Sequence, residues 1–137
     1  MKETLYNINR KNLIEYRLKR ADETLEEAEY NARGMYYNAA VNRLYYACFY
    51  AAAALMLKYN LDTSTHKGVR NQLGLQFITA GKLEPRYGSI YSRLYQARQA
   101  GDYEDFVYCD ENMYNEYKPL ANDFITAMKE LINSVKD

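Results

Sequence analysis

In four separate stretches of this chain, apolar residues recur at alternating intervals of four and three residues. This spacing lines them up on one face of an α-helix, and a helix of this kind needs neighbours that cover that face. No stretch supports a strand comparably well. The pattern therefore predicts an all-α fold, namely an antiparallel four-helix up-and-down bundle with a short extra helix.

The first two predicted helices are long. One carries its apolar stripe from Ile14 to Ala32, and Gly34 is expected to end it as a C′ glycine. The other covers about residues 36–59 and is apolar on two sides, with small alanines that allow close helix packing. We therefore expect this second helix at the centre of the bundle. Its two sides are Tyr37, Val41, Leu44, Cys48, Ala51 and Leu55, and Ala40, Ala47 and Ala54.

A short third helix and a fourth helix are predicted from cap and breaker residues. Ser64 or Thr65 can cap the short helix, whose apolar anchors are Val69, Leu73 and Phe77. Pro85 suits the first turn of the fourth helix, which is expected to stop near Gly101. Its inward stripe is Leu83, Tyr87, Ile90, Leu94 and Ala97.

The last predicted helix begins after Asp110, which is expected to act as its N-cap. Pro119 is expected to kink this helix or break it locally, because proline lacks the backbone N–H of the helical ladder. The expected inward stripe is Met113, Tyr117, Leu120, Phe124, Ala127 and Leu131.

The charge balance limits the classes of partner. Lys and Arg together number 18 and so do Asp and Glu, and the pI is about 6.6. Sequence-independent binding to DNA or RNA needs surplus positive charge, so any contact with nucleic acid must come from a local patch. The length of 137 residues fits a single domain, 1–137. General DNA binding is not expected.

Several features indicate a cytoplasmic protein. The N-terminal segment has no apolar core of a secretory signal. The longest apolar run, residues 47–57, is shorter than the roughly 20 residues that cross a bilayer, so a buried helix is expected and no membrane contact. Cys48 and Cys109 are far apart and match no metal or haem spacing, which suits a reducing compartment.

Metal and cofactor chemistry find little support in the sequence. His66 is the single histidine, whereas di-metal bundle sites need two Glu-x-x-His pairs. No phosphate-cradling GxxxxGK[ST] segment and no GxSxG elbow is present. We therefore predict neither a metal site nor a cofactor.

Tyrosine is unusually frequent, with 16 residues and no tryptophan. Most of these rings are expected to pack at the edge of the core, although a base-stacking or interface role is the alternative. Arg43 lies on one helical face with Tyr46 and Tyr50. A charge on this apolar helix needs a partner, and an internal carboxylate is favoured over a second subunit or a ligand phosphate.

Two segments carry a family resemblance. The run GMYYNAAVNRLYYACFYAAAALMLKYNLDTSTHKGV is followed later by RLYQARQAGDYEDF. Together they resemble the HEPN domain, in its prokaryotic stand-alone branch, and the likeness extends from about Leu18 to Leu131. It implies a helical bundle that dimerises and that is often paired with a minimal nucleotidyltransferase, including in toxin–antitoxin modules.

The resemblance also bears on catalysis. Some members of the family are metal-independent ribonucleases with an Arg followed after four to six residues by a His. Arg98 matches that arginine, but Tyr103, Glu104 and Asp105 occupy the window of the histidine. A tyrosine is a poor general base at neutral pH, so ribonuclease activity is not expected.

Three hypotheses follow. The favoured one is a dimeric binding module for a nucleotidyltransferase-like partner, a nucleotide or RNA, in a toxin–antitoxin-like pair. The second is a ribonuclease in which Arg98 binds phosphate and His66, or another displaced group, acts as base. The third is a purely structural helical oligomer, in which Arg98 pairs internally with Asp102 or Asp105. The candidate site residues are Arg43, Tyr46, His66, Arg98, Asp102 and Tyr103.

Overall fold

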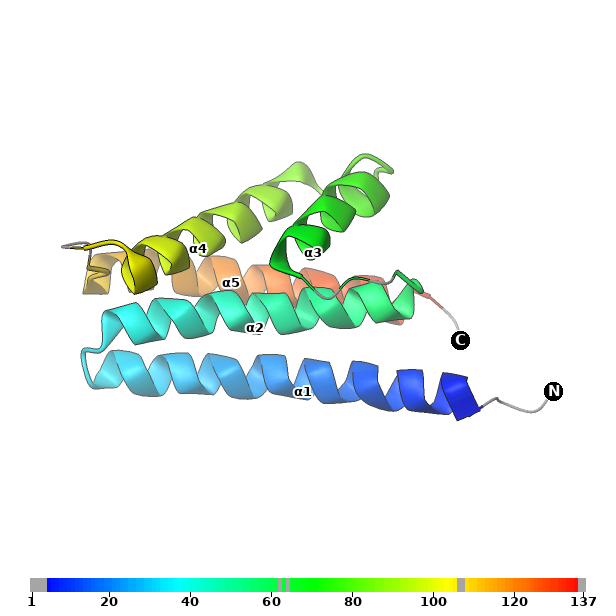
Figure 1. The fold of residues 1–137 in the computed structure, drawn as a ribbon, viewed down its shortest axis with the longest axis horizontal. Helices are drawn as coiled ribbons and strands as arrows, with labels where there is room; N and C mark the ends of the chain where they lie inside the picture. Colours follow the sequence, from blue (N-terminus) through cyan, green and yellow to red (C-terminus); the bar gives the residue numbers. More distant parts are fainter. Residues whose placement is uncertain (1–4, 62, 64, 106–107, 136–137) are drawn as a thin grey trace.

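The protein folds into long antiparallel helices beside a shorter helical excursion (Figure 1). The computed structural model describes residues 5–61, 63, 65–105 and 108–135, and within them it contains no strand. This confirms the predicted all-α bundle with a short extra element. The helices are α1 (Leu5–Arg33), α2 (Tyr37–Lys58), α3 (His66–Gln72), the π-helix η1 (Leu73–Ile78), α4 (Pro85–Tyr103) and α5 (Glu111–Asn133).

Helix α2 is the centre of the molecule, as its two apolar sides predicted. It packs against α1, α4 and α5, and every residue from Ala51 to Met56 is buried. By length and hydropathy alone α2 could span a membrane, but 67% of the relevant window is buried inside the bundle. It is therefore the core helix of the bundle, as the short apolar run suggested.

The turn between α1 and α2 differs from the prediction. Helix α1 ends at Arg33, so the expected boundary is right. However, the residue in the left-handed region is Met35, with φ of 65°, and Gly34 does not have a positive φ. The expectation of Gly34 as a left-handed C′ glycine is therefore wrong. A β-carbon on Gly34 would lie 2.9 Å from the Tyr36 ring, so close packing is what favours glycine there.

The short third helix continues into a π-helix that the sequence pattern did not predict. Thr65 caps α3 by accepting a hydrogen bond from Gly68 N at 2.9 Å, whereas Ser64 lies outside the described residues. In η1 the backbone bonds reach one residue further than in an α-helix, as in Thr79 N to Gly74 O at 2.9 Å. The predicted anchors of this excursion are buried: Val69, Leu73 and Phe77.

Helices α4 and α5 complete the bundle. Pro85 occupies the first turn of α4, which passes Gly101 and ends at Tyr103. Asp110 caps α5 by accepting from Met113 N at 2.9 Å, as predicted. The helix α5 continues through Pro119, so the predicted local break is wrong.

The buried face of α5 is shifted by about one residue from the predicted stripe. Phe124 and Ala127 are buried as expected, but Met113, Tyr117, Leu120 and Leu131 are only partly buried at its flank. The buried face also includes residues one position further along the chain. The additional buried side chains are Tyr114, Ala121, Ile125, Met128 and Ile132.

Candidate functional site

Arg98 is a nearly buried cation surrounded by aromatic rings. It lies on α4 with its side chain 7% exposed. Its guanidinium carbon is between 5.3 and 5.7 Å from the ring centres of Tyr45, Tyr46, Tyr95 and Tyr103. The face of an aromatic ring attracts a cation, and the attraction grows when water is excluded. The tyrosines therefore stabilise a positive charge that would otherwise be costly to bury.

A carboxylate partly balances this charge. Asp102 Oδ2 lies 3.8 Å from Arg98 Nη1, one helical turn away, as one of the sequence alternatives proposed. The same carboxylate oxygen accepts a hydrogen bond from Asn42 Nδ2 on α2 at 2.8 Å. Arg98 Nε is buried and has no hydrogen-bond partner among the described residues. The guanidinium is thus held in place but keeps a donor that is not satisfied.

His66, the first residue of α3, lies in the same tyrosine cluster. Its Nδ1 is 2.6 Å from the Tyr45 hydroxyl. Its ring also contacts the rings of Tyr46 at 5.6 Å, Phe49 at 4.5 Å and Tyr95 at 6.4 Å between centroids. Burial and the positive charge of Arg98 lower the pKa of His66 below 6.5. The imidazole is therefore neutral at pH 7.

Two buried hydroxyls hold the imidazole in position. The Tyr45 and Tyr91 hydroxyls lie 3.1 Å apart. Burial raises the pKa of Tyr45 to about 12 and that of Tyr91 further, so both hydroxyls stay protonated. When the Tyr45 hydroxyl donates its proton to His66 Nδ1, Nε2 is the ring nitrogen that carries the imidazole proton. His66 would then present an N–H donor.

Arg98 and His66 converge on the same three rings, Tyr45, Tyr46 and Tyr95. The sequence could not place His66 beside Arg98, because the two residues belong to different helices. The prediction also omitted Tyr45 and Tyr95 from the site. The sequence does contain a pattern that indicates Tyr95. On α4, residues 91, 95 and 98 lie on one helical face, at intervals of four and three residues.

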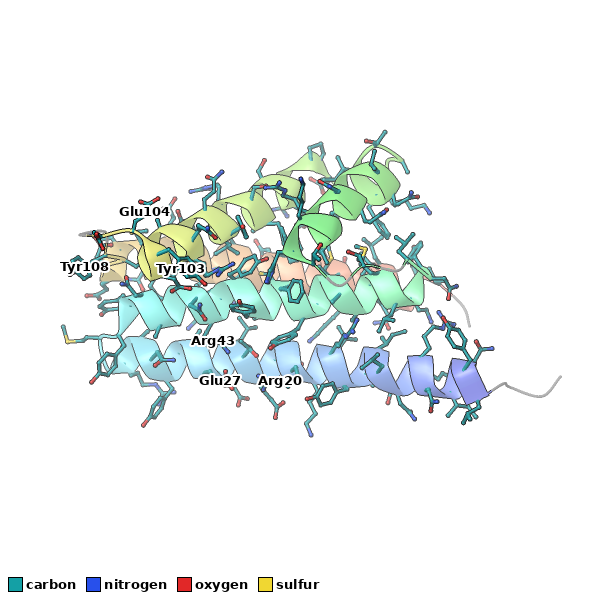
Figure 2. The ribbon with its side chains drawn as sticks, viewed as in Figure 1. Arg20, Glu27, Arg43, Tyr103, Glu104 and Tyr108 are labelled. Atoms are coloured by element: carbon teal, nitrogen blue, oxygen red, sulfur yellow. The ribbon has the colours of Figure 1, made fainter. Side chains whose placement is uncertain are left out.

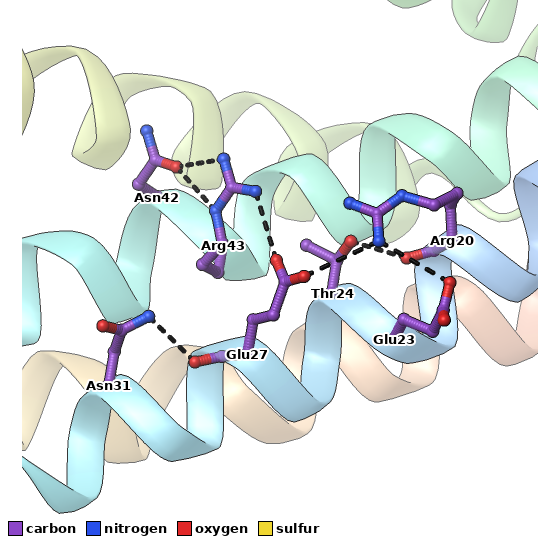
Figure 3. Close-up of polar contacts among 7 residues, drawn as sticks. All are labelled: Arg20, Glu23, Thr24, Glu27, Asn31, Asn42 and Arg43. Atoms are coloured by element: carbon purple, nitrogen blue, oxygen red, sulfur yellow. Dashed lines mark hydrogen bonds and ion pairs between the residues drawn. The ribbon is translucent and has the colours of Figure 1, made fainter.

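Arg43 extends the polar contacts away from this cluster (Figure 3). Its Nη1 lies 3.3 Å from Glu27 Oε1 on α1, so the favoured internal carboxylate partner is present. Its Nε and Nη2 donate to Asn42 Oδ1 at 3.0 and 2.8 Å, and its guanidinium lies over the Tyr46 ring at 5.0 Å. Arg20 reaches Glu27 at 3.6 Å from the other side. Arg43 therefore contributes to positioning of Asn42 and Tyr46.

Tyr103 belongs both to the Arg98 cluster and to the surface. It is 69% exposed, and Figure 2 shows it, with Glu104 and Tyr108, at the end of the bundle where α4 stops. The predicted residues Tyr46, His66, Arg98, Asp102 and Tyr103 thus lie in one region, with Arg43 at its margin.

A small cavity opens beside the imidazole. Its volume is about 110 Å³, and five residues line it: His66, Lys67, Arg70, Tyr91 and Tyr95. Three of these side chains are basic types and none is acidic. The cavity therefore offers hydrogen-bond donors to an anion. Across the described ranges, no three His, Cys, Asp or Glu side chains are grouped as a metal site would require.

A family relationship covers nearly the whole chain. The HEPN domain matches residues 14–137, nearly the whole chain. The chain belongs to the HEPN family. The resemblance noted in the sequence is thereby confirmed. This HEPN domain lacks a histidine in the window of four to six residues after Arg98. Its single histidine, His66, instead contacts tyrosine rings that also surround Arg98.

Individual relatives place this HEPN protein among prokaryotic sequences. It is similar to a "UPF0332 protein" of Thermotoga maritima, with 35% identity over 124 residues that cover 90% of this chain and 94% of the relative. It is also similar to two proteins of Methanocaldococcus jannaschii named "Putative toxin". One is 40% identical over 61% of this chain and 62% of its own length. The other is 28% identical over 76% and 71%.

Proposed function

We propose that this HEPN protein binds RNA or a nucleotide at the Arg98–His66 cluster and does not cleave it. The observation that carries the proposal is the convergence of Arg98 and His66 on the rings of one tyrosine cluster. Neighbouring cations and aromatic faces are what single-stranded nucleic acid binds, since phosphates need donors and bases stack on rings.

The charges around the cluster support an anionic ligand. Arg98 Nε is a buried donor without a partner, and such a donor costs about 1–3 kcal/mol unless an acceptor reaches it. Lys67 and Arg70, which line the neighbouring cavity, form no ion pair with a described residue. Because the formal net charge of the chain is zero, a local group of cationic side chains, rather than the overall charge, would have to attract the ligand.

The state of His66 favours binding over cleavage. A general acid must carry a proton it can give up near neutral pH, and the lowered pKa leaves His66 neutral there. The basic nitrogen Nδ1 is occupied by the Tyr45 hydroxyl at 2.6 Å. Tyr45 itself has a pKa of about 12 and cannot replace it. The imidazole is better suited to donate a hydrogen bond to a phosphate.

The biological setting we propose is a toxin–antitoxin-like pair in the cytoplasm. The support comes from the two similar proteins named "Putative toxin" and from the HEPN membership. Within that setting we propose that the protein forms a homodimer and engages a minimal nucleotidyltransferase as its partner. These two assignments rest on the family resemblance.

Metal-independent ribonuclease activity is the second candidate. The specific observation in its favour is that His66 shares three rings with Arg98, although it comes from a different helix. In this alternative Arg98 would stabilise the charge on the phosphate. In the tautomer of His66 that carries its proton on Nδ1 and donates it to the Tyr45 oxygen, Nε2 has a free lone pair and would act as the base.

One experiment separates the candidates. Purified protein is incubated with labelled single-stranded RNA in the presence of chelator, and both binding and cleavage are measured for wild type, Arg98→Ala, His66→Ala and the control Arg93→Ala. Arg93 is an exposed α4 arginine paired with Glu116 and lies outside the cluster. We expect binding without cleavage, weakened at least about tenfold by Arg98→Ala and unchanged by the control.

Other outcomes assign a different function. Cleavage that disappears in both Arg98→Ala and His66→Ala would make the protein a ribonuclease. Absence of RNA and nucleotide binding, with Arg98→Ala changing only thermal stability, would leave a purely structural helical oligomer.

A further inference from the structure

We propose that a two-part groove along α3, η1 and α4 holds one nucleotide unit, with its phosphate beside His66 and its base against η1. The cavity beside His66 is one part. A second cavity of about 380 Å³ adjoins it, because Arg70 and Tyr91 line both. This inference rests on the proposed binding of RNA or a nucleotide and adds where and in what orientation the ligand lies.

The first part is suited to phosphate. His66, Lys67 and Arg70 contribute its polar lining, and Arg98 lies close enough to lower the pKa of His66 by its charge. No described residue that lines either cavity is acidic. Lys67 and Arg70 are exposed and have no carboxylate partner in the described parts of the chain. A phosphate there would meet the cationic side chains of Lys67 and Arg70 without a competing carboxylate among the lining residues.

The second part is suited to a flat, largely apolar group. Leu73, Ile78 and Pro85 give it apolar walls, and the hydroxyls of Ser89 and Ser92 lie at its border. Tyr91, which lines both cavities, adds an aromatic side chain where the two meet. A purine or pyrimidine base combines flat apolar faces with polar edges, so both features of this lining match it.

Two glycines keep the second part open. A β-carbon on Gly88 would lie 2.7 Å from Ile78 Cδ1, so a side chain there would displace the end of the Ile78 side chain. Gly74 has no atom within 4 Å of the position of a β-carbon. Its missing side chain therefore leaves empty space in the groove rather than room for a neighbour. A larger residue at position 74 can fill the groove without a clash.

The π-helix η1 forms one wall of the second cavity. Over Leu73–Ile78 the backbone turn is wider than in an α-helix, with Thr79 N bonded to Gly74 O. Wide turns of this kind are costly and occur frequently at functional sites. Together the two cavities fall within the roughly 300–1,000 Å³ that small-molecule sites occupy. A phosphate joined to one heterocycle is the ligand class that uses both parts.

Calorimetric titration with 5′-AMP, adenosine and inorganic phosphate tests the groove. We expect AMP to bind more tightly than either fragment, because only AMP occupies both parts. Arg70→Ala and Gly74→Leu should each weaken AMP binding at least about tenfold, by removing a charged donor or by filling the base position. Arg93→Ala, on α4 but outside the groove, should leave AMP binding unchanged. Circular dichroism verifies that each variant is folded.

A second arm identifies the source of the nucleotide unit. A single-stranded RNA with a 5′-phosphate is compared with the same RNA ending in a hydroxyl. Tighter binding of the phosphorylated RNA, lost in Gly74→Leu, assigns the groove to an RNA end. Binding of AMP with no effect of the RNA terminus assigns it to a free nucleotide.

The groove and the proposed function can fail separately. If AMP does not bind, or binds equally well to Arg70→Ala and Gly74→Leu, the groove assignment is wrong. If RNA still binds in an Arg98-dependent manner, the proposed function stands without the groove. If neither RNA nor AMP binds, both are wrong.

Discussion

At the scale of single residues, the positive charge of Arg98 affects the protonation of the His66 imidazole. Both side chains contact the same tyrosines, and the positive charge of Arg98 is one of two causes that lower the pKa of His66. Since His66 is the single histidine of the chain, its titration can be followed without assignment ambiguity. The pKa of His66 therefore reports whether Arg98 lies beside it in the cluster.

Arg98→Met should raise the pKa of His66. Removal of the cation removes one of the two causes of the lowering, while burial remains, so the pKa should stay below 6.5. An NMR titration of the imidazole protons measures it. Arg93→Met serves as the control, because Arg93 pairs with Glu116 outside the cluster. An unchanged His66 pKa in Arg98→Met would mean that the two side chains are not neighbours in solution.

Tyr45→Phe should destabilise the protein by about 1–2 kcal/mol, because it leaves His66 Nδ1 and the Tyr91 hydroxyl without their shared partner. Urea unfolding at pH 7.5 gives the free energy of unfolding. Tyr30→Phe is the matched control, since Tyr30 is 75% exposed and should tolerate the same change. Equal stability of the two variants would contradict a structural role for the hydroxyl chain.

At the scale of secondary structure, the sequence predicted the positions and caps of the helices better than their local geometry and helix type. Apolar spacing and the caps Thr65 and Asp110 are local signals, and both caps are confirmed. The π-helix Leu73–Ile78 was missed because its sequence differs little from that of an α-helix. The break at Pro119 was wrong because tertiary packing of α5 on α2 outweighs the loss of one backbone hydrogen bond.

The end of α1 offers a stabilising substitution. Met35 has φ of 65° and is 73% exposed, so it bears the cost of a left-handed conformation and contributes little packing. Met35→Gly should therefore increase the free energy of unfolding by about 1 kcal/mol. Thermal unfolding measures the gain.

Asn60 provides the comparison for that substitution. It also has a positive φ, of 57°, at the end of α2. Asparagine adopts this conformation more readily than methionine, so Asn60→Gly should gain less. A loss of stability in Met35→Gly would show that the side chain has a packing role that its exposure conceals.

At the scale of the whole molecule, pH should affect stability through His66. The folded pKa lies below the unfolded value of about 6.5, so between these values the unfolded chain binds a proton that the folded chain does not. The contribution of His66 to the free energy of unfolding is therefore fully present above about pH 6.5 and is lost as the pH falls through the lower pKa of the folded state. His66→Gln should remove this component. Urea unfolding from pH 7.5 to 5.5 compares the two proteins, and identical slopes would contradict the expectation.

The architecture was more accessible to sequence reasoning than the site. Helical periodicity over the entire chain specifies which faces are apolar, and the central place of α2 followed from its two apolar sides. The site depends on contacts between residues distant in sequence. Arg98 was found from its family motif, but the groove lined by Arg70, Gly74 and Tyr91 has no local pattern, because three separate elements meet there.

The excursion formed by α3 and η1 uses largely different residues to line the groove and to attach to the core. It supplies the lining residues His66, Lys67, Arg70 and Gly74, while the buried side chains of Val69, Leu73 and Phe77 anchor it to the core. Sequence change at the exposed positions Lys67 and Arg70 and at Gly74 can therefore alter what the protein recognises while the buried anchors are kept, which makes these positions the natural place for ligand preference to diverge.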